Sequence, residues 1–242
     1  MEKIVIVTGG SRGIGSALCI KYLSEGYKVY SIARSSNQMI NDLNFIQHQF
    51  DFSKDGTSDL ESLITTILKE NQDVYSICLI NNAGTLGEVK EVGNLVYSDI
   101  ERTFKINTLT PIFLTNLFIK ETQGWKALKS VVNISSGASI HPIEGWSIYG
   151  ATKSAIDIFT KVAGKEQISF EFPINVYSFY PGKVDTKMQE EIRAFSKQDF
   201  KNVNQFIEFK NQGVLNSSTN VAEKIFQLMH DTIIENGSIV KV

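Results

Sequence analysis

Short runs of apolar, β-branched residues recur along the chain and alternate with longer stretches of helical spacing. The apolar runs have the length of β-strands and fall at Ile4 to Thr8, Lys28 to Ala33, Phe45 to Phe50, Ile77 to Ile80, Val131 to Ser135, Ile174 to Phe179 and Ser238 to Val242. Strands that are apolar almost throughout and alternate with helices are typical of a parallel sheet buried on both faces. The pattern predicts one doubly wound α/β domain over residues 1–242, with a central parallel sheet of about seven strands.

One segment breaks this alternation. Residues 187–213 form a longer connection than the crossovers before them and are rich in charge and in Phe. Their apolar residues fall on two helical faces, Met188, Ile192 and Phe195 on the first, and Phe200, Val203, Phe206 and Ile207 on the second. We expect a helical flap over a substrate here, and we call residues 187–213 the flap segment. The alternative is a surface excursion that only covers the sheet edge.

Composition narrows the functional classes. The formal net charge of −2 argues against a nucleic-acid binder held by bulk positive charge. Cys19 and Cys78 lie within apolar runs, so we expect no disulfide and a reducing compartment. The chain shows neither signal-peptide features nor an apolar run of membrane-spanning length, which predicts a cytoplasmic protein without a membrane partner. His48, His141 and His230 lack metal-ligand spacing, and we expect no metal site.

A glycine-rich turn follows the first predicted strand and leads directly into a helix. It reads Thr8-Gly9-Gly10-Ser11-Arg12-Gly13-Ile14-Gly15. Glycines at 9, 13 and 15 allow a tight turn, let the backbone approach a diphosphate, and let the helix pack closely on the strand. We therefore expect the dinucleotide phosphates at Gly9, Ser11, Arg12, Gly13, Ile14 and Gly15. The spacing is Gly-x-x-x-Gly-x-Gly, and such a turn can also be merely structural.

The end of the second predicted strand carries information about the cofactor. An acidic residue at this position would bind the ribose 2′-hydroxyl of NAD, but the strand ends in Ala33-Arg34-Ser35 with no carboxylate. The guanidinium groups of Arg34 and Arg12 are suited to a 2′-phosphate instead. This predicts NADPH as cofactor, unless both arginines are ordinary surface charges.

A candidate for proton transfer lies further along the chain. Tyr149 is followed four residues later by Lys153, so on a helix the ammonium lies beside the phenol. A free tyrosine has a pKa of about 10, and a neighbouring cation favours the phenolate. Such a pair can exchange a proton with a carbonyl or alcohol oxygen, although the spacing alone is common on solvated helix faces.

Taken together, these features resemble the short-chain dehydrogenase/reductase family. The resemblance covers nearly the whole chain and rests on Thr8-Gly9-x-x-x-Gly13-x-Gly15, Asn81-Asn82-Ala83-Gly84, Asn107, Ser136, Tyr149-x-x-x-Lys153 and Pro181-Gly182. It implies a single Rossmann domain that transfers hydride between a nicotinamide and a carbonyl/alcohol pair.

The resemblance also implies roles for individual residues. Tyr149 would be the general acid, and Lys153 would depress its pKa and hold the nicotinamide ribose. Ser136 would bind the substrate oxygen, and Asn107 would hold a water that links Lys153 to solvent. Further cofactor contacts are implied at Asp51, Phe52, Asn82, Ala83, Gly84, Pro181, Gly182, Val184 and Thr186.

The substrate is indicated by a finer resemblance to the sepiapterin-reductase and benzil-reductase branch, whose members use NADPH on aromatic or vicinal dicarbonyl compounds. Trp146 would wall the pocket, with Leu86 and Met188 beside it, although Trp146 could be plain core filler. Lys241 stands where pterin-binding members carry an acid, which favours an apolar ketone or diketone over a pterin.

Other functions stay open at this point. The chain could act in the oxidative direction as an NADP-dependent alcohol dehydrogenase, or it could be a pterin carbonyl reductase. A non-catalytic NADPH-sensing protein is disfavoured because Asn107, Ser136, Tyr149 and Lys153 are all present. The resemblance also implies a homodimer or homotetramer assembled through the helices that carry Asn107 and Tyr149.

Overall fold

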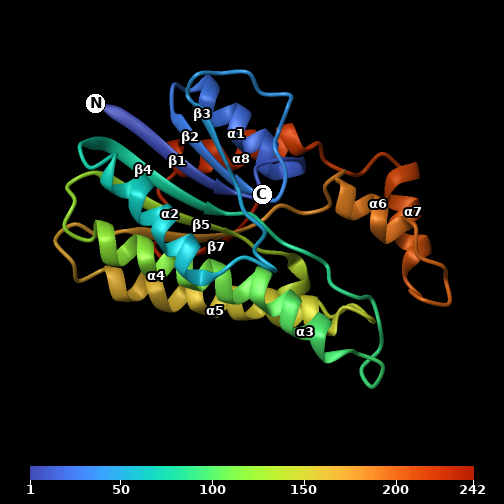
Figure 1. The fold of residues 1–242 in the computed structure, drawn as a ribbon. Coiled ribbons are helices and arrows are strands. Elements are labelled where there is room, and N and C mark those ends of the chain that lie inside the picture. Colours follow the sequence, from blue (N-terminus) through green and yellow to red (C-terminus); the bar gives the residue numbers. More distant parts are fainter.

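A seven-stranded parallel sheet forms the centre of the molecule, and a computed structural model describes it together with all other residues, 1–242 (Figure 1). The strand order is β3-β2-β1-β4-β5-β6-β7. The strands are β1 (Glu2–Thr8), β2 (Lys28–Ala33), β3 (Phe45–Gln49), β4 (Val74–Asn81), β5 (Leu128–Ile134), β6 (Asn175–Tyr180) and β7 (Ile239–Lys241). The predicted doubly wound sheet is confirmed, and each predicted strand is present within a few residues of its expected bounds.

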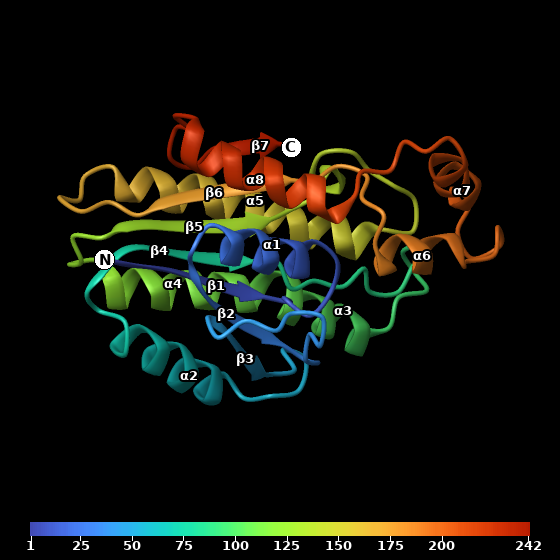
Figure 2. The same ribbon diagram turned by 90° about the horizontal axis from the view of Figure 1, so that it is seen from above.

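Helices cover both faces of this sheet (Figure 2). Helices α1 and α8 lie on one face, and α2, α4 and α5 lie on the other. The bounds are α1 (Gly13–Ser24), α2 (Thr57–Lys69), α3 (Tyr97–Phe104), α4 (Thr110–Thr122), α5 (Ser147–Gln167), α6 (Lys187–Arg193), α7 (Val203–Asn211) and α8 (Ser218–Asp231). A π-helical turn, Lys105–Leu109, joins α3 to α4, and a 3₁₀ turn, Gly137–Ser139, follows β5. No helix combines the length and the apolar character needed to span a membrane.

The core consists of two apolar layers, one on each face of the sheet. Within β1, Ile4 and Ile6 face the layer under α2, α4 and α5, whereas Val5 and Val7 face the layer under α1 and α8. All four side chains are fully buried. Because side chains alternate along a strand, a continuous apolar run fills both layers at once.

The strand order reverses around β1, which pairs with β2 on one side and β4 on the other. In open α/β sheets, ligands bind beside such a reversal, at the carboxyl ends of the strands. The predicted site residues follow the carboxyl ends of β1 to β6. The topology therefore gathers them at one edge of the sheet.

The flap segment forms two helices, α6 and α7, which project beyond that edge (Figure 1). The predicted helical character is confirmed, and Ile192, Phe200, Val203 and Phe206 are buried as their spacing indicates. Ile207 differs, because it remains partly exposed at the outer side of α7. The buried residues form a third apolar cluster with Leu86, Val89, Trp146 and Tyr149.

Candidate active site

The glycine-rich turn links β1 to α1 in a conformation that its glycines make possible. Gly9 and Gly13 have φ values of 71° and 57°, in the left-handed region that favours glycine. A Cβ on Gly15 would lie 2.2 Å from the Gly9 carbonyl oxygen, so only glycine allows the helix to begin this close to the strand. No side chain caps the N-terminus of α1, and its first turn contains no acidic residue. Its free N–H groups are suited to a phosphate.

The turn is held by the end of β4. Asn82 Nδ2 donates to the carbonyl oxygens of Thr8, at 3.1 Å, and Gly9, at 3.2 Å. Thr8 Oγ1 accepts from the backbone N–H groups of Asn82 and Ala83 at 3.0 and 3.1 Å. The Asn82 side chain therefore shapes the phosphate turn, and Ala83 and Gly84 present backbone beside it.

Asn37, which the sequence analysis did not identify, also supports the turn. Its buried side chain donates to the Gly10 carbonyl oxygen at 3.2 Å and to Ser16 Oγ at 2.7 Å. Gln47 accepts from the Asn37 backbone N–H at 2.6 Å. An isolated Asn in a loop after a strand gives no local signal of this contact, which depends on three segments meeting in space.

The two candidate arginines lie at the same end of the sheet. Arg12 precedes α1, Arg34 follows β2, and both are exposed with no ion pair or side-chain hydrogen bond to either guanidinium. The hydroxyls of Ser11 and Ser35 are 3.3 Å apart and bring the two loops together. Two unpaired cations at adjoining loops leave their charge available to an anionic ligand.

Asp51 and Phe52 follow β3, and their side chains differ in burial: that of Asp51 is partly exposed and that of Phe52 is buried. Ser53 donates from its N–H and its hydroxyl to Asp51 Oδ1, at 3.0 and 2.6 Å. The hydroxyl hydrogen bond, with a smaller contribution from Arg34, lowers the pKa of Asp51. The Phe52 ring is buried against Phe50 with ring centroids 5.2 Å apart, so only its backbone is available to a cofactor.

Tyr149 and Lys153 project from the same face of α5, as predicted. Their exposed fractions are 8% and 6%. Lys153 Nζ lies 5.7 Å from the centroid of the Tyr149 ring and donates to the Ile134 carbonyl oxygen, at the end of β5, at 2.8 Å. An ammonium has three donors, so two remain for a ligand.

Burial sets the protonation of this pair. It lowers the pKa of Lys153 to about 8, and the charge of Asp157 partly opposes this shift. Burial raises the pKa of Tyr149, with the Ser136 side chain opposing that shift. The direction at Tyr149 is opposite to the expected depression, because the Lys153 ammonium bonds to a carbonyl and does not offset the phenol's desolvation. The phenol is therefore held in its protonated form.

Asn107 lies within the π-helical turn between α3 and α4, where the sequence analysis expected plain helix. Its amide donates to the Thr85 carbonyl oxygen at 2.8 Å and to Thr152 Oγ1 at 3.2 Å, and it accepts from the Thr85 N–H at 2.9 Å. A Cβ on Gly84 would lie 3.5 Å from Asn107 Oδ1 and 3.8 Å from Lys153 Nζ. Gly84 thus leaves open the space beside both residues.

Ser136 and Trp146 flank the phenol from the β5–α5 connection. Ser136 Oγ accepts from the Ala138 N–H at 3.2 Å, which leaves its own proton free to donate. The Trp146 ring meets Tyr149 edge-on at 5.6 Å and stacks on Phe200 at 5.8 Å. Trp146 therefore links the phenol to the flap segment.

Leu86 and Met188, the other two residues predicted to contact the substrate, lie beside Trp146. Leu86 belongs to the third cluster and Met188 packs against it. A cavity of about 790 Å³ opens beside Trp146, but its lining does not include Tyr149 or Ser136. This cavity therefore adjoins the wall of the site and does not include the phenol.

The segment after β6 closes the site over the glycine turn. Gly182 has a φ of 73°, and Val184 forms a bridge to Asn216. Thr186 caps α6, and its Cγ2 would lie 3.5 Å from a Cβ on Gly13. Pro181, Gly182, Val184 and Thr186 thus lie between the phosphate turn and the flap segment.

These residues fit a nicotinamide dinucleotide. Glycines at 9, 13 and 84 leave bare backbone where a side chain would fill the space, α1 offers free N–H groups, and two arginines lack partners. A phosphate-binding turn at the reversal of a doubly wound sheet, joined to a buried Tyr/Lys pair, defines a dinucleotide-binding α/β protein.

Comparisons with known proteins identify the family of dinucleotide-binding proteins to which the chain belongs. Residues 3–197 match the family model for short chain dehydrogenases, and the chain belongs to this family of oxidoreductases. It is 36% identical to a benzil reductase ((S)-benzoin forming) of Bacillus cereus, covering 99% of both chains. It is 28% identical to the sepiapterin reductase of Mus musculus, covering 98% of this chain and 95% of that one. The crystal structure of the KRED1-Pglu enzyme matches with a TM-score of 0.85 and 26% identity, covering 98% and 100% of the two chains.

Proposed function

We propose that the protein is an NADPH-dependent carbonyl reductase for an apolar aromatic ketone or vicinal diketone. The buried Tyr149–Lys153 pair, with Ser136 beside it and the glycine turn at the same sheet edge, is the observation that carries this proposal. The similarity to a benzil reductase over 99% of the chain supports the substrate class.

The mechanism follows from what the residues can do at the carbonyl oxygen. A bound nicotinamide cofactor supplies the hydride that the carbonyl carbon receives. Tyr149 donates its proton to the oxygen, and Ser136 donates a hydrogen bond to the same oxygen while negative charge develops there. The raised pKa of Tyr149 keeps it protonated, which is the form that reduction consumes.

Lys153 positions the cofactor and stabilises the phenolate left after proton transfer. Its two remaining N–H donors can reach ribose hydroxyls, and its charge favours the ionised phenol. The Asn107 amide is already committed to Thr85 and Thr152, so we assign the water-binding role to the backbone of its π-helical turn.

The preference for NADPH is supported by charge at the end of β2. No carboxylate is present there to bind a 2′-hydroxyl, and Arg12 and Arg34 are both unpaired. A 2′-phosphate can take a bidentate hydrogen bond from either guanidinium.

The preference for an apolar carbonyl is supported by the wall of the site. Leu86 and Trp146 meet Met188 and the other apolar residues of the flap segment next to the phenol. We propose that this segment covers the substrate. A pterin would need polar partners for its amino groups, and Lys241, in β7, has the wrong charge for them.

We also propose a homodimer or homotetramer and a cytoplasmic location. Leu109, Ile158 and Val162 are exposed apolar residues of the π turn and α5, on the helices expected to form an interface. Cys19 and Cys78 are buried and unpaired, as in proteins of reducing compartments. Analytical ultracentrifugation tests the assembly, and a purely monomeric protein would contradict it.

A substrate panel tests the activity directly. We expect NADPH oxidation with benzil and related phenyl diketones, and weaker oxidation with sepiapterin. The matching alcohols with NADP⁺ measure the oxidative direction, which the alcohol-dehydrogenase alternative favours. Absence of cofactor turnover with every carbonyl would refute the proposal, and NADPH binding without turnover would favour a sensing protein.

A further inference from the structure

One buried carboxylate near the site has no part in the mechanism described above. Asp157 lies on α5 four residues after Lys153 and eight after Tyr149, so the three side chains share one helix face. Its exposed fraction is 6%, and it forms no ion pair within 4.0 Å. A buried charge of this kind needs other partners to be tolerated.

Those partners come from β6, and one of them also contacts the turn after β5. Ser178 Oγ donates to Asp157 Oδ1 at 2.8 Å, and the Tyr180 hydroxyl donates to Oδ2. Burial, followed by the hydrogen bond to Asp157, raises the pKa of Tyr180 to about 12, which keeps this phenol a donor. Its single proton goes to Asp157, so Ser139, whose Oγ is 2.6 Å from the Tyr180 oxygen, must be the donor to Tyr180.

Each partner adjoins a different part of the active site. Tyr180 is the last residue of β6 and precedes Pro181, where the segment that closes over the glycine turn begins. Ser139 ends the turn that Ser136 caps. Asp157 itself belongs to the helix that carries Tyr149 and Lys153. The Asp157 carboxylate thus joins α5 to β6 directly and, through Tyr180, to the turn after β5.

We propose that Asp157 is a positioning residue of this site, whose negative charge keeps the buried Lys153 ammonium protonated and whose hydrogen bonds hold the end of β6 and, through Tyr180, the Ser136 turn. This inference rests on the proposed function in assigning the cofactor ribose to Lys153. It differs from that proposal in naming a residue that touches neither substrate nor cofactor.

The charges around Lys153 support the electrostatic part. Burial lowers the pKa of Lys153 to about 8, and Asp157 is the one group whose charge raises it. The titratable groups that face this pair are Tyr149 from α5 and Tyr180 from β6, and both phenols are held neutral by burial. Lys153's other close contact, the Ile134 carbonyl, is uncharged.

Removing the charge should therefore lower the pKa of Lys153 further. We expect Asp157→Asn to shift the alkaline limit of NADPH binding, measured by fluorescence titration, to lower pH by roughly one unit, the low end of the effect of a nearby opposite charge. Above this limit, NADPH would bind about tenfold more weakly than to the wild type at the same pH. Measuring both proteins with an added Tyr149→Phe change removes titration of that phenol from the profile.

Matched variants separate charge from position. Asp157→Glu keeps the charge and should restore the alkaline limit, and Glu166→Gln removes an exposed charge from the same helix and should leave it in place. Tyr180→Phe keeps the charge of Asp157 but removes the hydrogen bond between Tyr180 and Asp157. We therefore expect a several-fold lower kcat/KM for carbonyl reduction, with the alkaline limit of NADPH binding unchanged.

An unchanged binding limit in Asp157→Asn, with normal circular dichroism, would overturn the electrostatic part. If that variant does not fold, Asp157→Ser makes the same test with a smaller neutral group, and unaltered kcat/KM in Tyr180→Phe overturns the positioning part independently. Failure of the proposed function would be seen in a different measurement. The test of Asp157 reads NADPH binding and needs no turnover, whereas wild-type turnover in Tyr149→Phe would refute the proposed mechanism and leave the role of Asp157 unaffected.

Discussion

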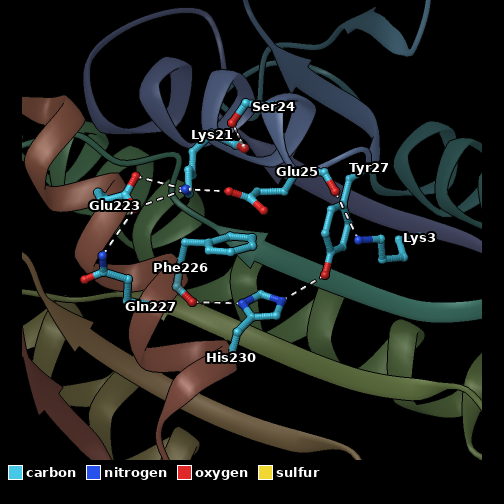
Figure 3. Close-up of polar contacts among 9 residues, drawn as sticks. All are labelled: Lys3, Lys21, Ser24, Glu25, Tyr27, Glu223, Phe226, Gln227 and His230. Carbon is cyan, nitrogen blue, oxygen red and sulfur yellow. Dashed lines mark hydrogen bonds and ion pairs between the residues drawn. The ribbon is translucent and has the colours of Figure 1, made fainter.

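Two polar clusters on opposite faces of the sheet use charge in different ways. Between α1 and α8, Lys21 Nζ lies 2.7 Å from Glu25 and 3.0 Å from Glu223, and both carboxylates are exposed to solvent (Figure 3). Under the active site, Lys153 and Asp157 are almost fully buried. Water screens the Lys21 cluster, so its charges contribute little to stability. Burial of the Lys153 cluster, in contrast, lowers the pKa of Lys153.

The surface cluster also contains a hydrogen-bonded histidine. His230 Nδ1 lies 2.8 Å from the Phe226 carbonyl oxygen, and its Nε2 lies 2.8 Å from the Tyr27 hydroxyl (Figure 3). Because a carbonyl only accepts, Nδ1 donates to Phe226. This arrangement packs α8 on α1 and β2, and no group of the active site takes part in it. We conclude that it stabilises the fold, whereas the proposed chemistry belongs to the buried cluster.

Helix α1 begins at the glycine-rich turn and carries Lys21 of the surface cluster near its other end. A change at its first turn should therefore give the largest difference in effect between the site and the surface cluster. Gly15, in its first turn, has no room for a Cβ beside Gly9 and Asn82, so Gly15→Ala must displace the phosphate turn. We expect NADPH affinity to fall at least about a hundredfold, because the main chain can no longer approach the diphosphate. Isothermal titration calorimetry measures the loss. Gly124→Ala is the matched control, since a Cβ there meets nothing within 4 Å, and equal NADPH affinity in both variants would contradict this view of the turn.

Lys153→Met should separate function from stability. In the folded protein, burial lowers the pKa of Lys153 to about 8 from its ordinary value of 10.5. The unfolded chain therefore binds more protons between these two pH values, and stability rises with pH there. Below pH 8 the buried ammonium costs the full penalty. We expect Lys153→Met to be more stable at pH 7, by about 1–3 kcal/mol, and to lose the rise between pH 8 and 10.5.

Urea unfolding at several pH values measures the free energies, and NADPH turnover should fall by about two orders of magnitude in the same variant. A variant that is less stable at pH 7 would show that Lys153 is a net stabilising contact, contrary to its depressed pKa.

Arg34→Asp tests whether an exposed charge can still act when its partner is a ligand. The change removes a cation and supplies a carboxylate for a ribose 2′-hydroxyl. We expect the ratio of kcat/KM with NADPH to that with NADH to fall by roughly tenfold to a hundredfold, the value of one charged hydrogen bond. An unaltered ratio would contradict a role of Arg34 in binding the 2′-phosphate and would leave it as an ordinary surface residue.

Lys21→Met should have the smallest effect. It removes the Lys21–Glu223 pair between α1 and α8 and the Lys21–Glu25 pair at the end of α1, and exposed pairs of this kind contribute little to stability. We expect Tm to fall by no more than about 2–4 °C, with unchanged NADPH affinity. A loss of NADPH affinity would show that the surface cluster is coupled to the site through α1.

Much of this organisation was predictable from local patterns. The β1 residues Ile4 to Val7 are apolar without interruption, which is the mark of a strand buried on both faces, and the Tyr149 to Lys153 spacing placed the pair on one helix face. The loops that carry Arg12 and Arg34 do meet, through the hydroxyls of Ser11 and Ser35.

The parts that could not be predicted depend on contacts distant in the chain. Asn37 and Asp157 carry no motif, and their importance appears only when their partners from other elements are in place. The π turn at Asn107 looks helical in sequence. The raised pKa of Tyr149 follows from burial by the flap segment and neighbouring loops, which the four-residue spacing to Lys153 does not contain.

The central claim is that the buried phenol of Tyr149 delivers the proton to a carbonyl oxygen. Steady-state NADPH oxidation with benzil, in the wild type and in Tyr149→Phe, tests it most directly, because the change removes one hydroxyl and keeps the ring that packs on Trp146. We predict a loss of at least about a hundredfold in kcat, with NADPH affinity nearly unchanged. A Tyr149→Phe enzyme that turns over benzil at the wild-type rate would contradict the account.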